Sequence, residues 1–310
     1  MTVVSRTLRI GTRRSPLARI QTDQVAAALG TPVEVVPIVT AGDRSAAALH
    51  QIGGTGVFVS ALRDALVRGD VDVAVHSYKD LPTAPAEGIV VAAVPLRADP
   101  RDALVARDGL TLGELPVGSR VGTGSPRRAA QLRALGLGVE VVPLRGNVDT
   151  RLTQVTDGHL DAVVLALAGL RRLGRDDVVT EVLDPIQLLP APAQGALAIE
   201  CRSGDDATLT AIAALDDPDS RACVAAERAV LTALGAGCSA PIGALAIVAD
   251  GDLPGDLPEL FLRASVTAAD GSAAVRLSAT GPVTDADGIG RRLAAELIFA
   301  GAEMMMGTTT

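Results

Sequence analysis

Aromatic residues, cysteine and lysine are all scarce in this sequence. Its 310 residues include one tyrosine, three phenylalanines and no tryptophan, so the aromatic platforms on which single-stranded nucleic acids stack are missing. The net charge of −8 also argues against general nucleic-acid binding, which usually requires a basic stripe. Three cysteines are too few and too scattered for a disulfide framework or a zinc cage. We therefore expect no nucleic-acid partner, no metal and a reducing, cytoplasmic environment.

Long apolar runs are missing as well. No stretch approaches 18 uninterrupted apolar residues, so we expect no membrane-spanning helix. The first residues do not contain the apolar core of a secretory signal. Hydrophobic residues make up 48% and charged residues 21%, which is typical of soluble globular proteins. A chain of 310 residues exceeds one comfortable core, so two or three domains are expected.

The first two thirds of the chain alternate apolar, strand-like runs with amphipathic, helix-like runs. Strands are expected at residues 8–12, 33–39, 71–75, 89–94, 120–122, 139–142, 162–167 and 196–200, and helices at 16–29, 58–68, 126–135 and 148–157. This alternation predicts mostly parallel sheets that are covered by helices on both faces.

One motif occurs twice in this region. Residues 10–16 and 121–128 both read as a strand, Gly-Thr, Ser-Pro and a helix, with Ser15 and Ser125 as the predicted N-caps. Each motif places a helix N-terminus at the carboxyl end of a strand, where open α/β sheets bind ligands and where anions are favoured. Two such halves predict two similar α/β domains with a cleft between them.

Two proline-rich crossings, at residues 95–100 and 190–195, predict hinges. We therefore expect domain 1 to comprise residues 1–95 with 196–215, domain 2 residues 100–190, and domain 3 residues 217–310. The last domain has a different pattern, with helices at 222–234 and 285–300 and strands near 244–248, 260–266 and 273–279. This predicts a small α+β domain, followed by a frayed tail from Met304 to Thr310.

Asp80 is the first candidate for chemistry. It follows a predicted buried strand, in a run that also holds His76, the only tyrosine (Tyr78) and the only lysine (Lys79). A carboxylate at the carboxyl end of a strand is well placed to act as a general acid or base or to stabilise a developing cation. The alternative is an aspartate that caps the turn beside a solvated lysine.

Arginines form a second group of candidates, because most of them lie at predicted helix starts. They are Arg13, Arg14, Arg127, Arg128, Arg145 and Arg151, with Arg171 and Arg172 further along. Arginine at a helix start opposes the helix dipole, so stability does not explain the placement, whereas bidentate binding of carboxylates does. Phosphate is a competing ligand, but neither a Walker nor a Rossmann glycine motif is present. Solvated arginines in an arginine-rich chain are the alternative.

Cys238 is the third candidate. It lies in a loop with three glycines and a proline, residues 235–243, where the backbone can approach a bound group closely. A thiol in this setting could be a nucleophile, a metal ligand, the anchor of a covalent cofactor, or simply a small packed residue. The three histidines are not spaced as metal ligands with any cysteine.

Nine motifs, in order along nearly the whole chain, resemble the porphobilinogen deaminase (hydroxymethylbilane synthase) family. They occupy residues 13–18, 56–58, 74–82, 100–103, 122–128, 144–148, 168–174, 194–196 and 237–243. The resemblance implies two α/β domains like those of periplasmic binding proteins, with a hinge and a cleft, plus a small α+β C-terminal domain. It also implies a monomeric cytoplasmic transferase of tetrapyrrole (haem) biosynthesis.

The activity implied by the resemblance is head-to-tail condensation of four porphobilinogen molecules into hydroxymethylbilane, with release of ammonia at each step. A dipyrromethane cofactor, attached to Cys238 through a thioether, primes the chain, and Asp80 is the catalytic acid/base. The implied cofactor-binding residues are Ser77, Lys79, Thr123, Ser125, Arg127, Arg128, Arg145 and Gly146. The implied residues for porphobilinogen and the growing polypyrrole chain are Arg13, Ser15, Phe58, Arg151, Arg172 and Gln194.

The sequence departs from the family in one loop. Where many members carry lysines, this chain has Gln51, Thr55 and Ser60, so we expect the loop to behave differently. Two other functions compete with the implied one. A two-lobed binding protein for a small carboxylate-rich ligand needs neither Cys238 nor Asp80, and a cysteine hydrolase needs a histidine beside Cys238.

Overall fold

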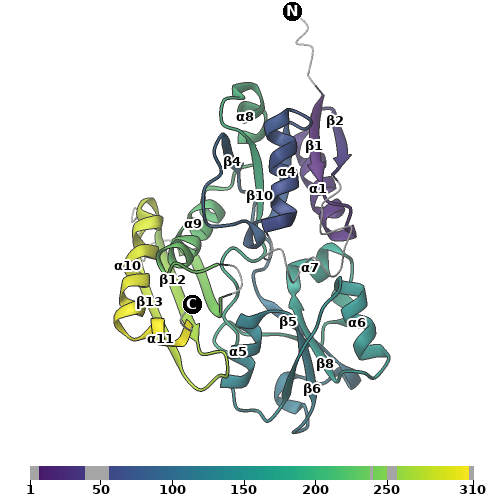
Figure 1. Ribbon diagram of the computed structural model, residues 1–310, viewed down its shortest axis with the longest axis vertical. Coiled ribbons are helices and arrows are strands. Elements are labelled where there is room, and N and C mark those ends of the chain that lie inside the picture. The colour runs from purple at the N-terminus through teal and green to yellow at the C-terminus, as the bar shows by residue number, and fades with distance from the viewer. Residues whose placement is uncertain (1–6, 39–55, 238–239, 250–256, 307–310) are drawn as a thin grey trace, which may run out of the picture. The chain divides into compact units, whose positions relative to one another are not determined.

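The computed structural model describes residues 7–38, 56–237, 240–249 and 257–306, with the side chains of residues 56–58 left aside. Contacts divide the chain into two units (Figure 1). Unit 1 comprises Met1–Arg97 with Ala196–Arg221, and unit 2 comprises Ala98–Gly195 with Ala222–Thr310. The residues predicted as domain 3 therefore group with unit 2, apart from the first few.

Unit 1 is built on a five-stranded sheet with the order β2-β1-β3-β10-β4. Its elements are β1 (Leu8–Thr12), α1 (Pro16–Leu29), β2 (Val33–Pro37), α4 (Gly56–Arg68), β3 (Val73–Ser77), the short 3-10 helix η1 (Tyr78–Asp80), β4 (Ile89–Ala93), β10 (Leu197–Arg202) and α8 (Asp206–Ala213). β1 runs parallel to β2 and β3, whereas β10 runs antiparallel to both of its neighbours, β3 and β4. The expectation of a mostly parallel sheet holds for every strand but β10.

Helices cover both faces of this sheet, as its near-continuous apolar strands require. On one face, Val25 of α1 and Ile212 of α8 pack with Val73 of β3. On the other face, Leu62 and Leu66 of α4 form a second core. Because side chains alternate along a strand, one sheet supplies both cores.

Unit 2 contains a second sheet with a matching arrangement, β7-β6-β8-β5-β9. Its elements are β5 (Asp102–Ala106), η2 (Arg107–Gly109), η3 (Leu112–Glu114), β6 (Arg120–Thr123), α5 (Pro126–Ala134), β7 (Glu140–Pro143), α6 (Val148–Thr156), β8 (Ala162–Ala166), α7 (Leu167–Arg172), η4 (Asp176–Val178) and β9 (Glu181–Val182). β6 is parallel to β7 and β8, and β5 runs against β8 and β9. The two sheets thus share a topology in which one strand is reversed, β10 in the first and β5 in the second.

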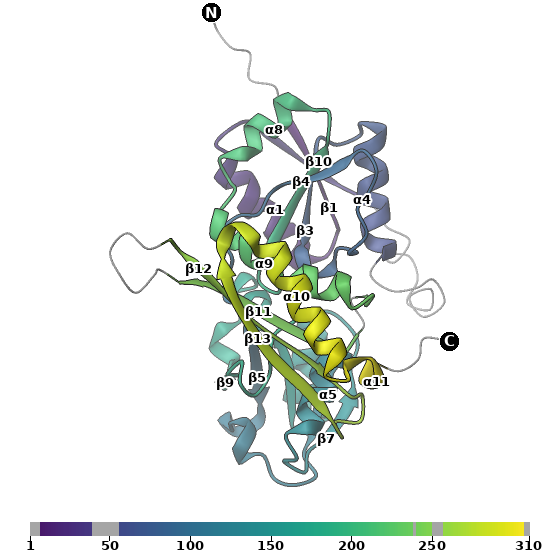
Figure 2. The same cartoon turned by 90° about the vertical axis from the view of Figure 1, so that its left-hand side faces the viewer.

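The remaining part of unit 2 is an antiparallel sheet, β11-β12-β13, with helices against one face (Figure 2). The elements are α9 (Pro218–Ala233, which starts at the end of unit 1), β11 (Ile242–Ala249), β12 (Glu259–Thr267), β13 (Ala274–Pro282), η5 (Val283–Asp285), α10 (Ala286–Phe299) and α11 (Ala302–Met306). Val230, Leu262 and Leu293 are among its fully or almost fully buried core residues.

The prediction of a frayed tail from Met304 to Thr310 was partly wrong. Residues up to Met306 are helical, because Ala302 is fully buried and Met305 and Met306 pack against the core of this sheet.

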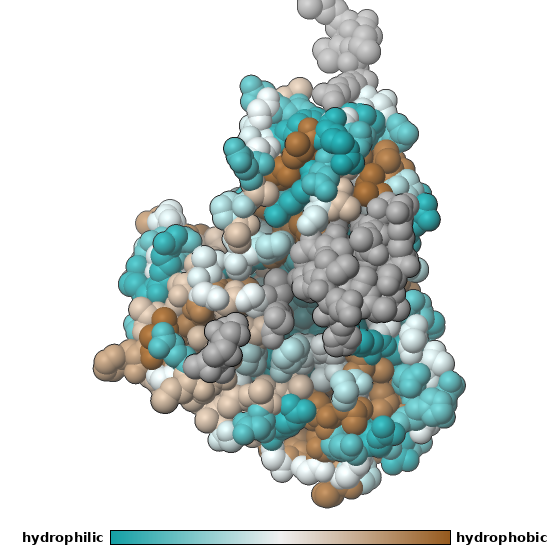
Figure 3. Space-filling model, in the orientation of Figure 1, coloured by the Kyte–Doolittle hydropathy of each residue, from teal (hydrophilic) through white to brown (hydrophobic). Residues whose placement is uncertain are grey.

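The described helices include none with both the length and the apolar character needed to cross a membrane. On the face drawn in Figure 3, hydrophilic and hydrophobic residues are interspersed over the described part of the surface.

Candidate active site

The repeated Ser-Pro motif forms two equivalent helix starts, which confirms both predicted N-caps. Ser15 Oγ accepts a hydrogen bond of 3.3 Å from the backbone N–H of Ala18 at the start of α1. Ser125 Oγ accepts one of 3.4 Å from the N–H of Arg128 at the start of α5. β1 and β6 precede these helices and occupy equivalent positions in their sheets. Each sheet therefore presents a helix N-terminus at the carboxyl end of a strand, where anions are favoured.

In unit 1, the turn after β3 contributes to a cavity of about 220 Å³. Its lining residues are Arg13, Ala18, Gln21, Val59, Val75, His76, Ser77 and Asp80. Gln21 Nε2 donates to Ser77 Oγ at 2.9 Å, which ties α1 to the end of β3. Asp80 is half-buried in η1, beside Lys79. The structure thus brings the predicted residues Arg13, Ser77 and Asp80 to one cavity, with a carboxylate and a guanidinium in its lining.

Behind this cavity lies a buried ionic cluster that the sequence reasoning did not identify. Glu200 of β10 accepts hydrogen bonds from Arg63 of α4, the shortest being 2.7 Å, and its Oε2 lies 3.2 Å from His76 Nε2. Burial alone would raise the pKa of Glu200, but His76 and Arg63 outweigh it and lower that pKa to about 2. Glu200 therefore stays ionised beside the strand residue that precedes Ser77.

In unit 2, a cavity of about 410 Å³ opens beside the start of α5. Its lining residues are Thr123, Gly124, Ser125, Pro126, Ala129, Arg133, Val141, Val142, Pro143, Leu144, Arg145 and Arg151. The lining contains arginines and hydroxyl groups but no carboxylate among the described residues. Burial lowers the pKa of Arg151, and repulsion from Arg128 and Arg145 lowers it further. Positive charge is therefore concentrated here, which favours an anionic ligand.

Glycines shape the backbone around this cavity. Gly146 has φ of 112°, a conformation that side-chain-bearing residues rarely adopt, and its carbonyl accepts a hydrogen bond of 2.9 Å from Arg151 Nε. A Cβ at Gly124 would lie 2.5 Å from the carbonyl oxygen of Leu144. A side chain at position 124 would clash with the backbone of Leu144, so this position requires glycine.

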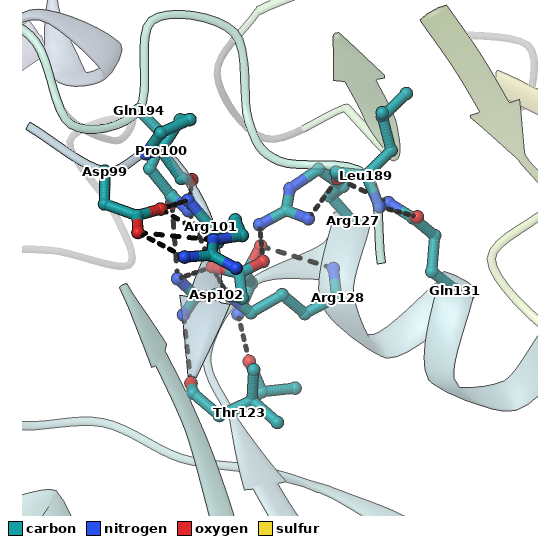
Figure 4. A network of polar contacts seen from close by, with 12 residues as sticks. Asp99, Pro100, Arg101, Asp102, Thr123, Arg127, Arg128, Gln131, Leu189 and Gln194 are labelled. Carbon is teal, nitrogen blue, oxygen red and sulfur yellow. Dashed lines mark hydrogen bonds and ion pairs between the residues drawn. The ribbon is translucent and has the colours of Figure 1, made fainter. Parts of the chain in front are cut away.

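Arg127, Arg128 and Gln194 lie in a different setting from the other predicted residues, because all three contact the buried carboxylate of Asp102 (Figure 4). Arg127 Nη2 and Arg128 Nη2 each donate to Asp102 at 2.7 Å, and Gln194 Nε2 does so at the same distance. Burial alone would raise the pKa of Asp102, but the two guanidiniums hold it well below its usual range. Two positive charges therefore share one negative charge in a buried cluster.

The other predicted residues are placed as follows. Arg172 Nη2 donates to the carbonyl of Gly195 at 2.8 Å, and burial lowers the pKa of Arg172. Phe58 belongs to α4, but its side chain lies outside the described part of the structure. Cys238 also lies outside the described residues, as do Gln51 and Thr55. Among the described residues, no group of three His, Cys, Asp or Glu side chains could hold a metal ion.

We expect the Asp102→Asn substitution to lower the free energy of unfolding by about 3–5 kcal/mol, because it leaves two buried guanidiniums without their counter-charge. Asp149→Asn is the matched control: its pair with Arg175 has a similar length of 2.8 Å, but both partners are about half exposed. The control should cost about 0–1 kcal/mol. Urea unfolding of the two variants measures the difference, and equal costs would contradict the assigned role of Asp102.

Comparisons with known proteins find similar sequences over most of the chain. The family model described as "Porphobilinogen deaminase, dipyromethane cofactor binding domain" matches residues 8–210, and the model of the C-terminal domain matches residues 221–298. The chain belongs to the porphobilinogen deaminase family. The cofactor-domain match spans both helix starts and both cavities.

Curated relatives in this family are similar along almost their full length. The porphobilinogen deaminase of Mycobacterium bovis is 59% identical over 304 residues, covering 96% of this chain and 98% of the relative. That of Nocardia farcinica is 58% identical, covering 96% and 88%, and porphobilinogen deaminase 1 of Streptomyces coelicolor is 56% identical, covering 98% and 99%.

Among solved structures, the methionine-binding protein MetQ aligns with a TM-score of 0.42 and 14% identity, covering 67% of this chain and 89% of that one.

Proposed function

We propose that the chain is a porphobilinogen deaminase (hydroxymethylbilane synthase), which joins four porphobilinogen molecules head to tail and releases ammonia at each step. Family membership over nearly the whole chain supports this activity. Its main structural support is the arginine cavity of unit 2. The lining combines Arg145, Arg151 and Ser125, without a carboxylate among the described residues. Every pyrrole unit brings two carboxylates, which this donor set suits.

A dipyrromethane cofactor fits the same residues. The cavity of about 410 Å³ gives the group space beside the start of α5, and its lining offers hydroxyl and guanidinium donors for carboxylates. The bound group would supply the primer to which new pyrroles are added, through a thioether to Cys238. The residues proposed to hold it are Ser77, Lys79, Thr123, Ser125, Arg127, Arg128, Arg145 and Gly146.

The Asp102 cluster refines the role of Arg127 and Arg128. Asp102 neutralises only one of the two guanidiniums, so a net positive charge remains buried beside Arg151. We propose that these two arginines act mainly through this charge and through the position they give to α5, while Arg145 and Arg151 bind carboxylates directly.

The substrate and the growing chain are proposed to contact Arg13, Ser15, Phe58, Arg151, Arg172 and Gln194. Asp80 acts as the acid/base that assists loss of ammonia and stabilises positive charge that develops on the pyrrole. Ser77, which Gln21 holds, and His76, which lies beside Glu200, precede the turn that carries Asp80. We further propose that the protein is a cytoplasmic monomer that requires neither nucleic acid nor membrane.

Arg151→Gln tests this assignment. We expect kcat/KM for porphobilinogen to fall about 10- to 150-fold, because a charge-assisted hydrogen bond contributes about 1.5–3 kcal/mol. Hydroxymethylbilane formation and ammonia release are measured together, since a binding protein without catalysis would release no ammonia. Arg291→Gln, which removes an exposed arginine paired with Asp287 on α10, is the control and should match the wild type. Equal values of kcat/KM for the two variants would show that Arg151 does not bind the substrate.

A further inference from the structure

A buried carboxylate that the proposed chemistry does not use lies on α9. Glu227 is fully buried, and its two oxygens accept hydrogen bonds from two distant backbone N–H groups. Oε2 accepts from Ala193 at 2.6 Å, and Oε1 accepts from Ala246 at 2.7 Å. Ala193 belongs to the chain segment 189–195 that precedes the return to unit 1, and Ala246 belongs to β11.

These two contacts attach one strand to that segment. In the described part of the chain β11 is an edge strand, and its outer edge meets the backbone of Pro190. The N–H of Ala244 donates to the carbonyl of Pro190 at 2.9 Å. The N–H of Ala246, two residues later in the same strand, donates to the carboxylate of Glu227. A Cβ at Gly243 would lie 2.8 Å from the carbonyl oxygen of Leu189, so the two backbones approach closely.

The same segment is attached on its other side to the helix that borders the arginine cavity. The carbonyl of Leu189 accepts from Arg127 Nη1 at 2.5 Å and from Gln131 Nε2 at 3.0 Å. The N–H of Leu189 donates to Gln131 Oε1 at 2.7 Å. Hydrogen bonds therefore connect α5 to Leu189, and the adjacent Pro190 to β11. Glu227 adds a second connection between this segment and β11.

The loop that contains Cys238 joins α9, which carries Glu227, to β11, which Glu227 holds. α9 ends in a Schellman motif, in which the N–H of Ala236 bonds to the carbonyl of Leu231 and Gly235 has φ of 61°. The N–H of Ala240 bonds to the carbonyl of Gly237, so the residues flanking positions 238 and 239 are themselves hydrogen-bonded.

We propose that Glu227 is a positioning residue for the reaction. It fixes the strand that follows the Cys238 loop to residues 189–193, and so sets where the tethered pyrroles lie relative to Arg145 and Arg151. The role rests on the proposed function. A carboxylate suits this role, because the groups at Ala193 and Ala246 are both N–H donors. A glutamine would turn an NH₂ group toward one of them and lose that hydrogen bond.

The strain at Ala193 supports this role. Its φ of 60° places a side-chain-bearing residue in the left-handed region, a conformation that costs about 1–3 kcal/mol and persists only when its surroundings enforce it. Ala193 is fully buried, and its N–H is the group that Glu227 holds at 2.6 Å. Releasing this bond is expected to let the segment relax and β11 shift with it.

The test compares Glu227→Gln with Leu293→Ala, a cavity-forming change in the same core that leaves the polar contacts intact. Both are assayed well below their melting temperatures. We expect Glu227→Gln to carry the dipyrromethane mass and to keep KM within about twofold, but to lose about 10- to 100-fold in kcat, as expected for a displacement near 1 Å. Leu293→Ala should lose stability and keep kcat.

If Glu227→Gln fails to accumulate, Glu227→Asp serves instead, because it keeps the charge but is one methylene too short to hold both N–H groups. A kcat equal to that of Leu293→Ala, for whichever variant folds, would overturn the positioning role alone. Wild-type protein that lacks both the cofactor mass and turnover would instead overturn the proposed function, and this inference with it.

Discussion

Replacement of Asp80 by asparagine is expected to reduce turnover of porphobilinogen by about 10²- to 10⁴-fold, the range that proton transfer by a positioned side chain contributes. Asparagine has nearly the shape of aspartate but can neither take up a proton nor carry a negative charge. Because Asp80 is a half-buried residue in the lining of a cavity and Ser77 is held by Gln21, the substitution should leave the fold intact.

Two further observations separate a catalytic role from a structural one. The Asp80→Asn protein should still carry the dipyrromethane group, since the arginine cavity of unit 2 does not include Asp80. Asp64→Asn removes an exposed carboxylate from α4 and should retain wild-type rates. Near-normal turnover by Asp80→Asn would leave this residue as no more than a turn-capping aspartate.

Local signals in the sequence were sufficient to predict the helix starts and most strands. Ser15 and Ser125 cap their helices as the Ser-Pro pattern predicts, because capping depends only on residues within one turn. The reversed strands were harder to predict. β5 was missed, and β10 was predicted as a strand without its antiparallel direction, since the direction depends on where the chain returns to the sheet.

The buried charge clusters could not be predicted from the sequence for a related reason. Asp102 meets Gln194 across 92 positions, and Glu200 meets Arg63 across 137 positions. A single sequence gives no distance between such residues. One signal was available nevertheless: Asp102 opens an apolar run and Glu200 interrupts one, and an ionisable residue in a buried strand needs a partner.

The sequence pattern treated four arginines alike, but the structure places them in two different settings. Arg145 and Arg151 line a cavity, whereas Arg127 and Arg128 are committed to Asp102. All four lie at helix starts, so the position in a helix does not distinguish an arginine that binds a ligand from one that balances a buried carboxylate. That distinction depends on Asp102, which lies 25 positions before Arg127.

Replacement of Cys238 by alanine is expected to abolish turnover, because the thioether is the only proposed attachment of the primer. The chain has two other cysteines, but they should not substitute for it. Cys201 and Cys223 are buried, and burial raises the pKa of Cys201 to about 11, so its reactive thiolate is scarce at neutral pH. Cys223→Ala serves as the control and should retain both turnover and the attached group.

The most direct test of the account is the intact mass of the purified protein. The wild type and Cys223→Ala should each exceed the mass of the polypeptide by two linked pyrrole units, and incubation with porphobilinogen should add further units. Cys238→Ala should show the polypeptide mass alone. Active wild-type protein with an unmodified mass, or a Cys238→Ala protein that keeps the added mass, would contradict the assignment of Cys238 as the anchor of a dipyrromethane primer.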